Sequence, residues 1–233
     1  MFVRVYLLSL HELKNPEELE EFLKTASLRV DEVRRRKAEK IRNPRGQAVS
    51  LGAGLLLQKA VADFLKPEVG KPGGSERSAS IGLLEIFRIT TGEILARLGE
   101  PVLLKYRYGE MGKPYLVNVP LYYNLSHSGD FVLCAVSEQE IGADIQEIRK
   151  GDIMRVAERY FAEEELAKLQ ECRTEAERNR LLFQLWTKKE AFGKLTGKGI
   201  AEVISESMLC RADVEWQPFD APEGYAAAVC RNK

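Results

Sequence analysis

Cysteine and histidine are scarce in this chain, with four cysteines and two histidines among 233 residues. The cysteines lie far apart, at Cys134, Cys172, Cys210 and Cys230, with no Cys-x-x-Cys pair and no clustering with histidine. That spacing gives no sign of a zinc site, and the number is far below the density of a secreted disulfide scaffold. We therefore expect reduced thiols and a cytoplasmic protein.

The sequence also lacks net charge and a long apolar segment at its start. Lys+Arg 35 balance Asp+Glu 35, so no overall field attracts nucleic acid or an anionic membrane, and any anion site must be local. The first residues, MFVRVYLLSLHELKN, hold only a short apolar run interrupted by Arg4, too brief for a signal peptide or a membrane span. We expect a strand there, and neither a nucleic-acid nor a membrane partner.

What the chain does have is enough apolar sequence for a large core, since 45% of its residues are hydrophobic. In NPEELEEFLK, Asn15 can cap a helix, Pro16 can take its first position and Glu18 completes a capping box. Further helices are expected over residues 30–42 and 49–66. Gly52 and Gly54 in the latter favour close helix packing over backbone approach to a ligand. Residues 67–80, rich in Pro, Gly and Ser, read as a loop.

The second half repeats this order of elements. We expect a helix over residues 81–99, a strand over 102–108, a turn with a short extended piece over 109–117, and a hairpin of 131–136 with 141–146. Helices follow over 152–161, 163–172 and 175–197, and strands over 213–217 and 224–230. The order predicts an α+β protein of two similar α/β subdomains, residues 1–118 and 119–233, with a ligand cleft between them.

Two acidic residues stand out against this background. In IGADIQ, a strand places Ile141, Ala143 and Ile145 on one face and Asp144 and Gln146 on the other.

In WTKKEAFGK, Trp186, Glu190 and Lys194 fall at i, i+4 and i+8 and share one helix face. Asp144 and Glu190 could supply oxygen ligands for Mg²⁺, which completes its shell with water and phosphate oxygens. Spacing alone leaves the alternative open that each acid is solvated or paired in an ordinary salt bridge.

Two further polar segments permit two readings. His127 lies in NLSHSGDF, expected to be a turn, where a histidine is commonly an exposed spectator. The adjacent Ser126 and Ser128 add donors suited to phosphate oxygens. The basic run RRRKAEK, Arg34 to Lys40, is favoured as a solvated helix face over a nucleic-acid site, with a phosphate on a small ligand still open.

Taken in order, these segments resemble a known family. IGADIQ, RYFAEEEL and LWTKKEAFGKLTGKG are similar to the G-x-D, F-x-x-x-E and W-x-x-K-E-A-x-x-K signature of 4′-phosphopantetheinyl transferases. Upstream, GKPYL and NLSHSGDF look like companion motifs of the larger, pseudodimeric subfamily typified by the surfactin-synthetase-activating enzyme. The resemblance covers about residues 34 to 199. It implies a monomeric pseudodimer with coenzyme A at the subdomain interface, and transfer of phosphopantetheine to a serine of an apo acyl or peptidyl carrier protein.

The resemblance also implies roles for individual residues. Asp144 and Glu190 match the Mg²⁺ ligands and, with Lys194 on the pyrophosphate, form the expected catalytic set. The remaining positions expected to bind coenzyme A are Arg34 and Lys37 at the 3′-phosphate, Lys113 in the adenine and phosphate pocket, Ser126 and His127 at phosphates, and Lys189 at the phosphate or adenine side. Glu165 matches a family acid whose role is left open.

This chain departs from the family pattern at two positions. Gln146 stands where some members have a second metal-binding glutamate, so it would ligate the metal through its amide oxygen or a water. Ala48 stands where many relatives carry an arginine, for which Arg45 or Gln47 could substitute. A non-catalytic nucleotide- or carrier-binding module that has kept the fold is therefore the alternative function.

Overall fold

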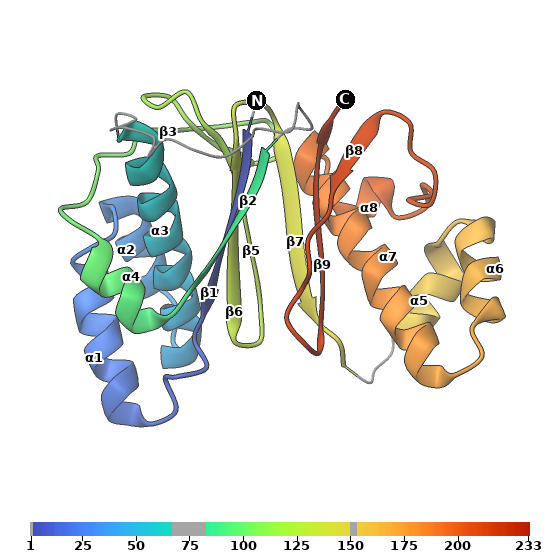
Figure 1. Ribbon diagram of the computed structural model, residues 1–233, viewed down its shortest axis with the longest axis horizontal. Helices are drawn as coiled ribbons and strands as arrows, with labels where there is room; N and C mark the ends of the chain where they lie inside the picture. Colours follow the sequence, from blue (N-terminus) through green and yellow to red (C-terminus); the bar gives the residue numbers. More distant parts are fainter. Residues whose placement is uncertain (1, 67–82, 150–152) are drawn as a thin grey trace, which may run out of the picture.

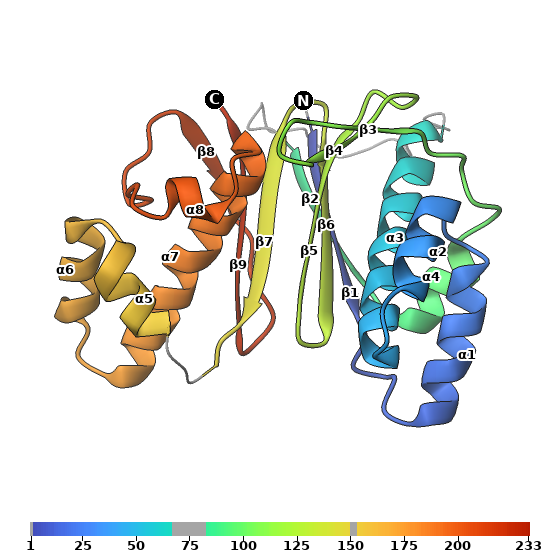
Figure 2. The same ribbon diagram turned by 180° about the vertical axis from the view of Figure 1, so that it is seen from behind.

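The chain folds into four layers in the order helices, sheet, sheet, helices (Figure 1). A computed structural model describes residues 2–66, 83–149 and 153–233. The expected α+β class is confirmed, whereas the loop expected over residues 67–80 lies outside the described residues. Figure 2 shows the same layers from behind, with α1–α4 on one side of the two sheets and α5–α8 on the other.

The first sheet has four strands in the order β2-β1-β6-β5. Strand β1 (Phe2–Ser9), expected from the apolar start of the chain, pairs in parallel with β2 (Leu83–Ile89) and antiparallel with β6 (Phe131–Ser137). Strand β5 (Tyr122–Ser128) pairs antiparallel with β6 at the edge of the sheet. A separate pair, β3 (Tyr106–Tyr108) and β4 (Pro114–Leu116), forms a small hairpin.

The second sheet has three strands in the order β7-β9-β8, all antiparallel. They are β7 (Ile141–Glu147), β9 (Tyr225–Asn232) and β8 (Val214–Gln217). Its edge strand β7 lies against the edge strand β5 of the first sheet. This seam positions the site described below.

Helix ends follow the local signals in the sequence. Helix α1 (Pro16–Ser27) begins at the Asn15 cap, whose side chain accepts from the Glu18 N–H at 2.8 Å in a complete capping box. Helix α7 (Glu175–Thr196) ends at Gly197, whose φ of 74° is a left-handed conformation that favours glycine. The other helices are α2 (Glu32–Glu39), α3 (Pro44–Leu65), α4 (Thr91–Arg97), α5 (Ile153–Tyr160), α6 (Glu163–Glu171) and α8 (Ile200–Val203).

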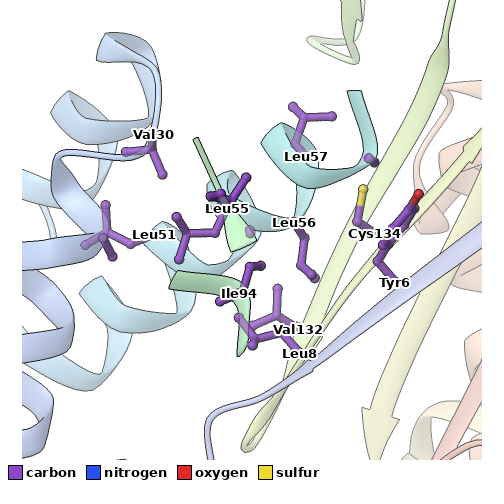
Figure 3. Packing of buried hydrophobic residues seen from close by; sticks show 14 of the residues in the cluster. Tyr6, Leu8, Val30, Leu51, Leu55, Leu56, Leu57, Ile94, Val132 and Cys134 are labelled. Carbon is purple, nitrogen blue, oxygen red and sulfur yellow. The ribbon is translucent and has the colours of Figure 1, made fainter. Parts of the chain in front are cut away.

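Alternation along the strands builds the core between the layers. Val3, Val5 and Leu7 of β1 face the second sheet and meet Ile141 and Ile145 of β7. Tyr6 and Leu8 of the same strand belong to the cluster that includes the helix residues. Figure 3 shows Leu56 of α3 beside Leu8 and Val132 of the first sheet, within the cluster that joins α3 to that sheet.

Helix α3 is the central element of the first helix layer. It is long and apolar enough to cross a membrane by length and composition, but 72% of the relevant window is buried inside the structure, as in the core helix of a globular protein. The glycines allow this packing. A Cβ on Gly52 would lie 3.0 Å from Leu8 Cδ2, and one on Gly54 would lie 2.5 Å from Arg34 Cγ. The expectation of close helix packing is confirmed.

Three expectations about elements need correction. Residues 81–99 do not form one helix, because Leu83–Ile89 is a strand and only Thr91–Arg97 is helical. Residues 131–136 and 141–146 do not pair as a hairpin, because β7 bonds to β9 in the other sheet. His127 lies within strand β5, whose hairpin partner is β6.

The sheets also divide the chain later than expected. Strands β5 and β6, assigned above to residues 119–233, are hydrogen-bonded into the first sheet with β1. The second sheet begins at Ile141. If the chain is divided according to the sheet that each strand joins, the boundary falls between Ser137 and Ile141 instead of at residue 118.

Candidate active site

A cavity of about 700 Å³ opens where the helix layers approach the edge of the first sheet. Its walls come from α2, α3, the turn between β3 and β4, β5, and the C-terminal end of α7. Five residues predicted from the sequence to bind coenzyme A line it: Arg34, Lys37, Lys113, His127 and Lys194. Residues far apart in the sequence thus surround one space.

Asp144 is not among the lining residues but is hydrogen-bonded to one of them, Lys194; it lies on the β7 face predicted from the sequence and is only 2% exposed. Its Oδ1 accepts hydrogen bonds from Ser126 Oγ at 2.6 Å and from Lys194 Nζ at 2.7 Å. Its Oδ2 accepts from Gln146 Nε2 at 3.3 Å. The carboxylate is therefore held by three neighbours, which fixes its direction.

Ser126 has a different role from the predicted phosphate contact. It is buried, and its hydroxyl donates to Asp144 while accepting from the Ile145 N–H at 3.3 Å. Since the hydroxyl proton is used by Asp144, Ser126 orients that carboxylate and ties β5 to β7.

Glu190 lies on α7, one turn before Lys194. It is partly buried, and within the described ranges of the chain its carboxylate has no hydrogen bond and no ion pair. Burial and the nearby charge of Asp144 raise its pKa, while Lys194 opposes the shift. Two neighbouring carboxylates, one of them without a partner, form a site that a cation would stabilise.

Close contact between α7 and β7 brings these acids together. A Cβ on Gly142 would lie only 2.0 Å from the Ala191 carbonyl oxygen, so the helix backbone rests directly on the strand at that glycine. Gly142 and Asp144 share a strand face, and Ala191 follows Glu190 on the helix. The glycine thus permits the approach that sets Asp144 beneath Glu190 and Lys194.

On the other side of the cavity lie three basic side chains, Arg34, Lys37 and His127, which are not balanced by as many acidic ones. Partial loss of hydration, and then the Arg34 charge, lower the pKa of Lys37. Loss of hydration, followed by Lys194 and Lys37, likewise lowers the pKa of His127. These groups destabilise one another's positive charge, as expected for a site that receives an anion.

Arg34, which lines the cavity, lies in the first turn of the capped helix α2. Asp31 caps α2 by accepting from the Arg34 N–H at 3.0 Å, and its other oxygen accepts from the Tyr106 hydroxyl at 2.9 Å. This links the β3–β4 hairpin to α2. Gly54 lets the Arg34 stem lie flat against α3.

Lys113 lines the cavity but is already paired. Its ammonium forms an ion pair with Glu140 and donates to the Leu195 carbonyl at 2.8 Å. The side chain therefore fastens the β3–β4 turn to the end of α7. Its charge is therefore already compensated within the protein.

Lys189 and Glu165 lie elsewhere, so Lys189 is not among the predicted residues that the structure brings to the cavity. Both side chains are 0% exposed and form an ion pair of 2.6 Å. Lys189 also donates to the Glu206 carbonyl at 2.6 Å, and Glu165 accepts from the Met208 N–H at 2.8 Å. The pair joins α6 and α7 to the segment after α8, which gives Glu165 a structural role.

Arg45 and Gln47 do not supply the arginine that is absent at position 48. Arg45 pairs with Asp130 and donates to the Leu13 carbonyl at 2.9 Å, and Gln47 donates to the Ile41 carbonyl at 2.8 Å. Both side chains are thus held outside the cavity.

The cavity also contains polar residues that sequence reasoning missed. Ser50 of α3 and Asn124 of β5 line it, and each is 7% exposed. A hydroxyl inside the apolar stretch VSLGAGLLL and an asparagine at the start of NLSHS were the available signals.

The acidic side of the site offers a divalent cation only a few protein ligands. Among residues 2–66, 83–149 and 153–233, no three His, Cys, Asp or Glu side chains cluster as metal ligands. Asp144 and the unpartnered Glu190 provide two carboxylates, and Gln146 provides an amide beside Asp144. This set suits Mg²⁺, which takes few protein ligands and completes its octahedron with water and phosphate oxygens.

Comparison with known proteins agrees with this geometry. A model of the 4′-phosphopantetheinyl transferase superfamily matches residues 140–230, which include β7, α7 and β9. A putative 4′-phosphopantetheinyl transferase of Synechocystis is 42% identical over 46% of this chain and 45% of its own length. The 4′-phosphopantetheinyl transferase gsp of Aneurinibacillus migulanus is 32% identical over 62% of both chains.

The match to the Salmonella typhimurium 4′-phosphopantetheinyl transferase AcpT is longer. It is 32% identical over 163 residues, covering 69% of this chain and 76% of AcpT. The chain thus spans about half to three quarters of the length of the relatives named here, and the residues that the family model matches include Asp144, Glu190 and Lys194. The chain therefore belongs to the 4′-phosphopantetheinyl transferase superfamily.

Proposed function

We propose that this protein is a holo-carrier-protein synthase, which transfers the 4′-phosphopantetheine group of coenzyme A to a serine of an apo acyl or peptidyl carrier protein and releases 3′,5′-ADP. One observation carries the proposal. A single cavity is lined by Arg34, Lys37 and His127 and also by Lys194, which connects it to the adjacent carboxylates of Asp144 and Glu190. Coenzyme A has a matching separation of charge, with a phosphate monoester on the ribose and a pyrophosphate further along.

The reactive pyrophosphate belongs at the acidic side. Mg²⁺ held by Asp144 and Glu190, with Gln146 bound through its oxygen or through a water, would neutralise charge on the leaving 3′,5′-ADP. Lys194 would contact the same pyrophosphate as a point charge. The ribose phosphate would then lie against Arg34, Lys37 and His127.

In the reaction, the carrier serine oxygen forms a bond to the β-phosphorus and the bond from that phosphorus to the 3′,5′-ADP oxygen breaks. The serine proton must leave as the new bond forms. Glu190 would accept it directly or through a water.

We further propose that the two α/β halves form a pseudodimer around the cavity, that the protein acts as a monomer, and that it works in the cytoplasm. The paired arrangement of helix and sheet layers supports the first point (Figure 1). All four cysteines are free thiols, which supports a reducing compartment.

The test is direct. The purified protein is incubated with coenzyme A, Mg²⁺ and an apo-carrier, and the carrier is weighed by mass spectrometry. A gain equal to one phosphopantetheine, lost in the Asp144→Ala and Glu190→Ala variants while their melting temperatures stay near wild type, is the expected result. No gain with acyl and peptidyl carriers alike would count against the proposal.

The alternative, a non-catalytic module that binds the nucleotide or the carrier, is favoured by one feature. Gln146 gives the metal site one negative charge fewer than a third carboxylate would. Binding of coenzyme A without any mass gain in the carrier would support that alternative.

A further inference from the structure

Two polar side chains of the cavity each have a buried oxygen atom that is shielded from water and makes no hydrogen bond within the protein. Ser50 Oγ and Asn124 Oδ1 are buried and have no hydrogen bond. Over the part of the chain that the structure describes, three buried side-chain atoms are in this state, and these two line the same cavity. The third, on Arg231, lies outside it.

Such groups are costly in a folded protein. A buried hydroxyl or amide without a partner costs about 1–3 kcal/mol, so native structures contain few of them. Two in one cavity indicate hydrogen-bonding positions whose partner arrives with a ligand.

Ser50 lies beside the cationic side of the cavity. It stands four residues from both Gly46 and Gly54 on α3, so the three share one helix face. A Cβ on Gly54 would lie 2.5 Å from Arg34 Cγ, which places the Arg34 stem against this face. A serine hydroxyl at that place can donate to an oxygen of the anion that Arg34 and Lys37 bind.

Asn124 lies on the other side, near Lys194. Along the seam, Ser126 Oγ accepts from Ile145 N–H and Ser128 Oγ accepts from Glu147 N–H. Asn124 lies two residues before Ser126 on β5, and Ala143 lies two residues before Ile145 on β7. Extending the pairing by this step therefore places Asn124 opposite Ala143. The Ala143 carbonyl accepts from Lys194 Nζ at 3.2 Å, so the Asn124 amide lies in the region of the Lys194 ammonium.

We propose that Ser50 and Asn124 are two uncharged ligand-binding residues of the cavity. Ser50 donates a hydrogen bond to the phosphate monoester of coenzyme A, and Asn124 binds a part of the same molecule away from that phosphate, on the Lys194 side. The assignment rests on the proposed function, because it takes coenzyme A as the occupant.

Calorimetric titration with coenzyme A and with 3′-dephospho-coenzyme A tests both halves of the proposal. The second ligand lacks only the phosphate monoester. Ser50→Ala should weaken the binding of coenzyme A about 10-fold or more, the effect of losing a hydrogen bond to a charged group, and should leave 3′-dephospho-coenzyme A unchanged. Asn124→Ala should weaken both ligands by a similar factor of about 3- to 10-fold.

Stability measurements separate a ligand contact from a structural role. Ser50→Ala removes an unpaired buried hydroxyl, so its melting temperature without ligand should equal or exceed that of wild type. Asn124→Leu, which keeps the volume without the amide, serves as a second variant should Asn124→Ala unfold. Ser27→Ala, at a half-buried serine that ends α1 outside the cavity, is the matched control and should bind both ligands as wild type does.

Other combinations of affinities would contradict the role proposed for Ser50 or for Asn124. Equal weakening of both ligands by Ser50→Ala would remove its assignment to the phosphate, and wild-type affinity in that variant would remove its contact altogether. Wild-type affinities in both Asn124 variants would do the same for Asn124. If the wild-type protein binds neither ligand, the proposed function itself fails, and that result is distinct from the others.

Discussion

At Glu190, the side chain that the proposed function needs is one that lowers the stability of the ligand-free protein. It sits partly buried beside Asp144, and within the described segments it has no hydrogen bond or ion pair. The neighbouring Asp144, by contrast, is held by Ser126 and Lys194. A protein selected only for stability would place a neutral side chain at position 190.

This conflict predicts how Glu190→Gln changes stability. Because burial and Asp144 raise the pKa of Glu190 above its unfolded value, the protonated form favours the folded state. The protonated carboxyl group therefore adds to the free energy of unfolding below about pH 4, and this stabilisation is lost as pH rises through the pKa of the folded state. At pH 7 the ionised side chain destabilises the ligand-free fold. Without Mg²⁺ at pH 7, Glu190→Gln should melt higher than wild type, by about 2–4 °C for each kcal/mol gained.

The same variant should respond differently to metal. Mg²⁺ should raise the melting temperature of wild type, because it binds the folded state, and should leave Glu190→Gln nearly unchanged. Differential scanning calorimetry from pH 4 to 8, with and without Mg²⁺, measures both effects. A variant that melts lower than wild type at pH 7 in the absence of metal would mean that Glu190 is stabilised by its surroundings.

Lys194 is the second residue with a distinct kinetic prediction. Its ammonium donates to Asp144 at 2.7 Å and faces the cavity. Losing a charge-assisted contact to phosphate, worth about 1.5–3 kcal/mol, should lower kcat/KM for coenzyme A roughly 10- to 150-fold in Lys194→Ala. Lys194→Arg should recover part of this, since the charge remains but the geometry changes. Steady-state kinetics for both variants provide the check, and wild-type kcat/KM in Lys194→Ala would place the pyrophosphate elsewhere.

At the scale of elements, the helix α7 shows which features of a site follow from sequence. A period of 3.6 residues puts Glu190 and Lys194 on one face, and the structure places both at the same carboxylate. The same geometry turns Lys189 by about 100° from Glu190, away from the cavity. The resemblance to the family motif placed Lys189 in the predicted site, whereas helix geometry separates it from Glu190.

Strand β2 shows what sequence patterns leave undecided. In LLEIFRI, Leu84 packs toward the second sheet while Phe87 and Ile89 pack toward the helices. A short segment that is apolar on both faces cannot be distinguished from a buried helix by periodicity. Its strand conformation depends on pairing with β1, a partner about 80 residues away.

The reversal between β6 and β7 is a related case. SEQE does turn the chain, as its composition predicts, but β7 then pairs with β9 of the second sheet. Local sequence encodes the turn, and only tertiary packing decides which strand becomes the partner. For the same reason the sequence did not reveal that β5 and β6, which follow residue 118, join the first sheet.

The buried ion pair of Glu165 and Lys189 makes a prediction at this scale. Because both groups are fully buried, Glu165→Gln would leave an uncompensated ammonium inside the protein and should lower the free energy of unfolding by about 3–5 kcal/mol. Burial already lowers the pKa of Lys189, so its charge depends on the partner. Urea unfolding monitored by circular dichroism gives the value.

A double variant is the control. Replacing both partners with apolar residues of similar size, Glu165→Leu with Lys189→Met, should recover much of the loss, because no buried charge remains. If Glu165→Gln is as stable as wild type, the pair does not anchor α6 to α7.

For the whole molecule, the junction between the sheets decides whether the two sides of the cavity act together. The sheets meet face to face through apolar side chains and edge to edge at β5 and β7. At that edge, the hydroxyls of Ser126 and Ser128 accept the N–H groups of Ile145 and Glu147. Side chains thus join strands that belong to different sheets. Neither their partners nor the seam is visible in the sequence, where NLSHS reads as a polar turn.

The seam yields a prediction that compares its two serines. Ser128→Ala removes the acceptor of the Glu147 N–H at 2.9 Å, in a half-buried place that water can reach, and should cost about 1 kcal/mol of unfolding free energy. Ser126→Ala removes an acceptor and also a donor to the buried Asp144, so it should cost more, about 1–3 kcal/mol.

The two variants should separate again in their metal dependence. Without the Ser126 hydroxyl, Asp144 loses one of the groups that fix its direction, and the Mg²⁺ concentration for half-maximal transfer should rise several-fold. Ser128→Ala should raise that concentration less, because the Ser128 hydroxyl does not contact Asp144 and, of the proposed metal ligands, reaches only the amide oxygen of Gln146, at 3.4 Å. Transfer assays across a Mg²⁺ series, paired with urea unfolding of both variants, measure the two effects independently. If both serines change the Mg²⁺ dependence equally, the seam acts on the metal site through the alignment of the sheets, and the specific contact between Ser126 and Asp144 is not what orients the carboxylate.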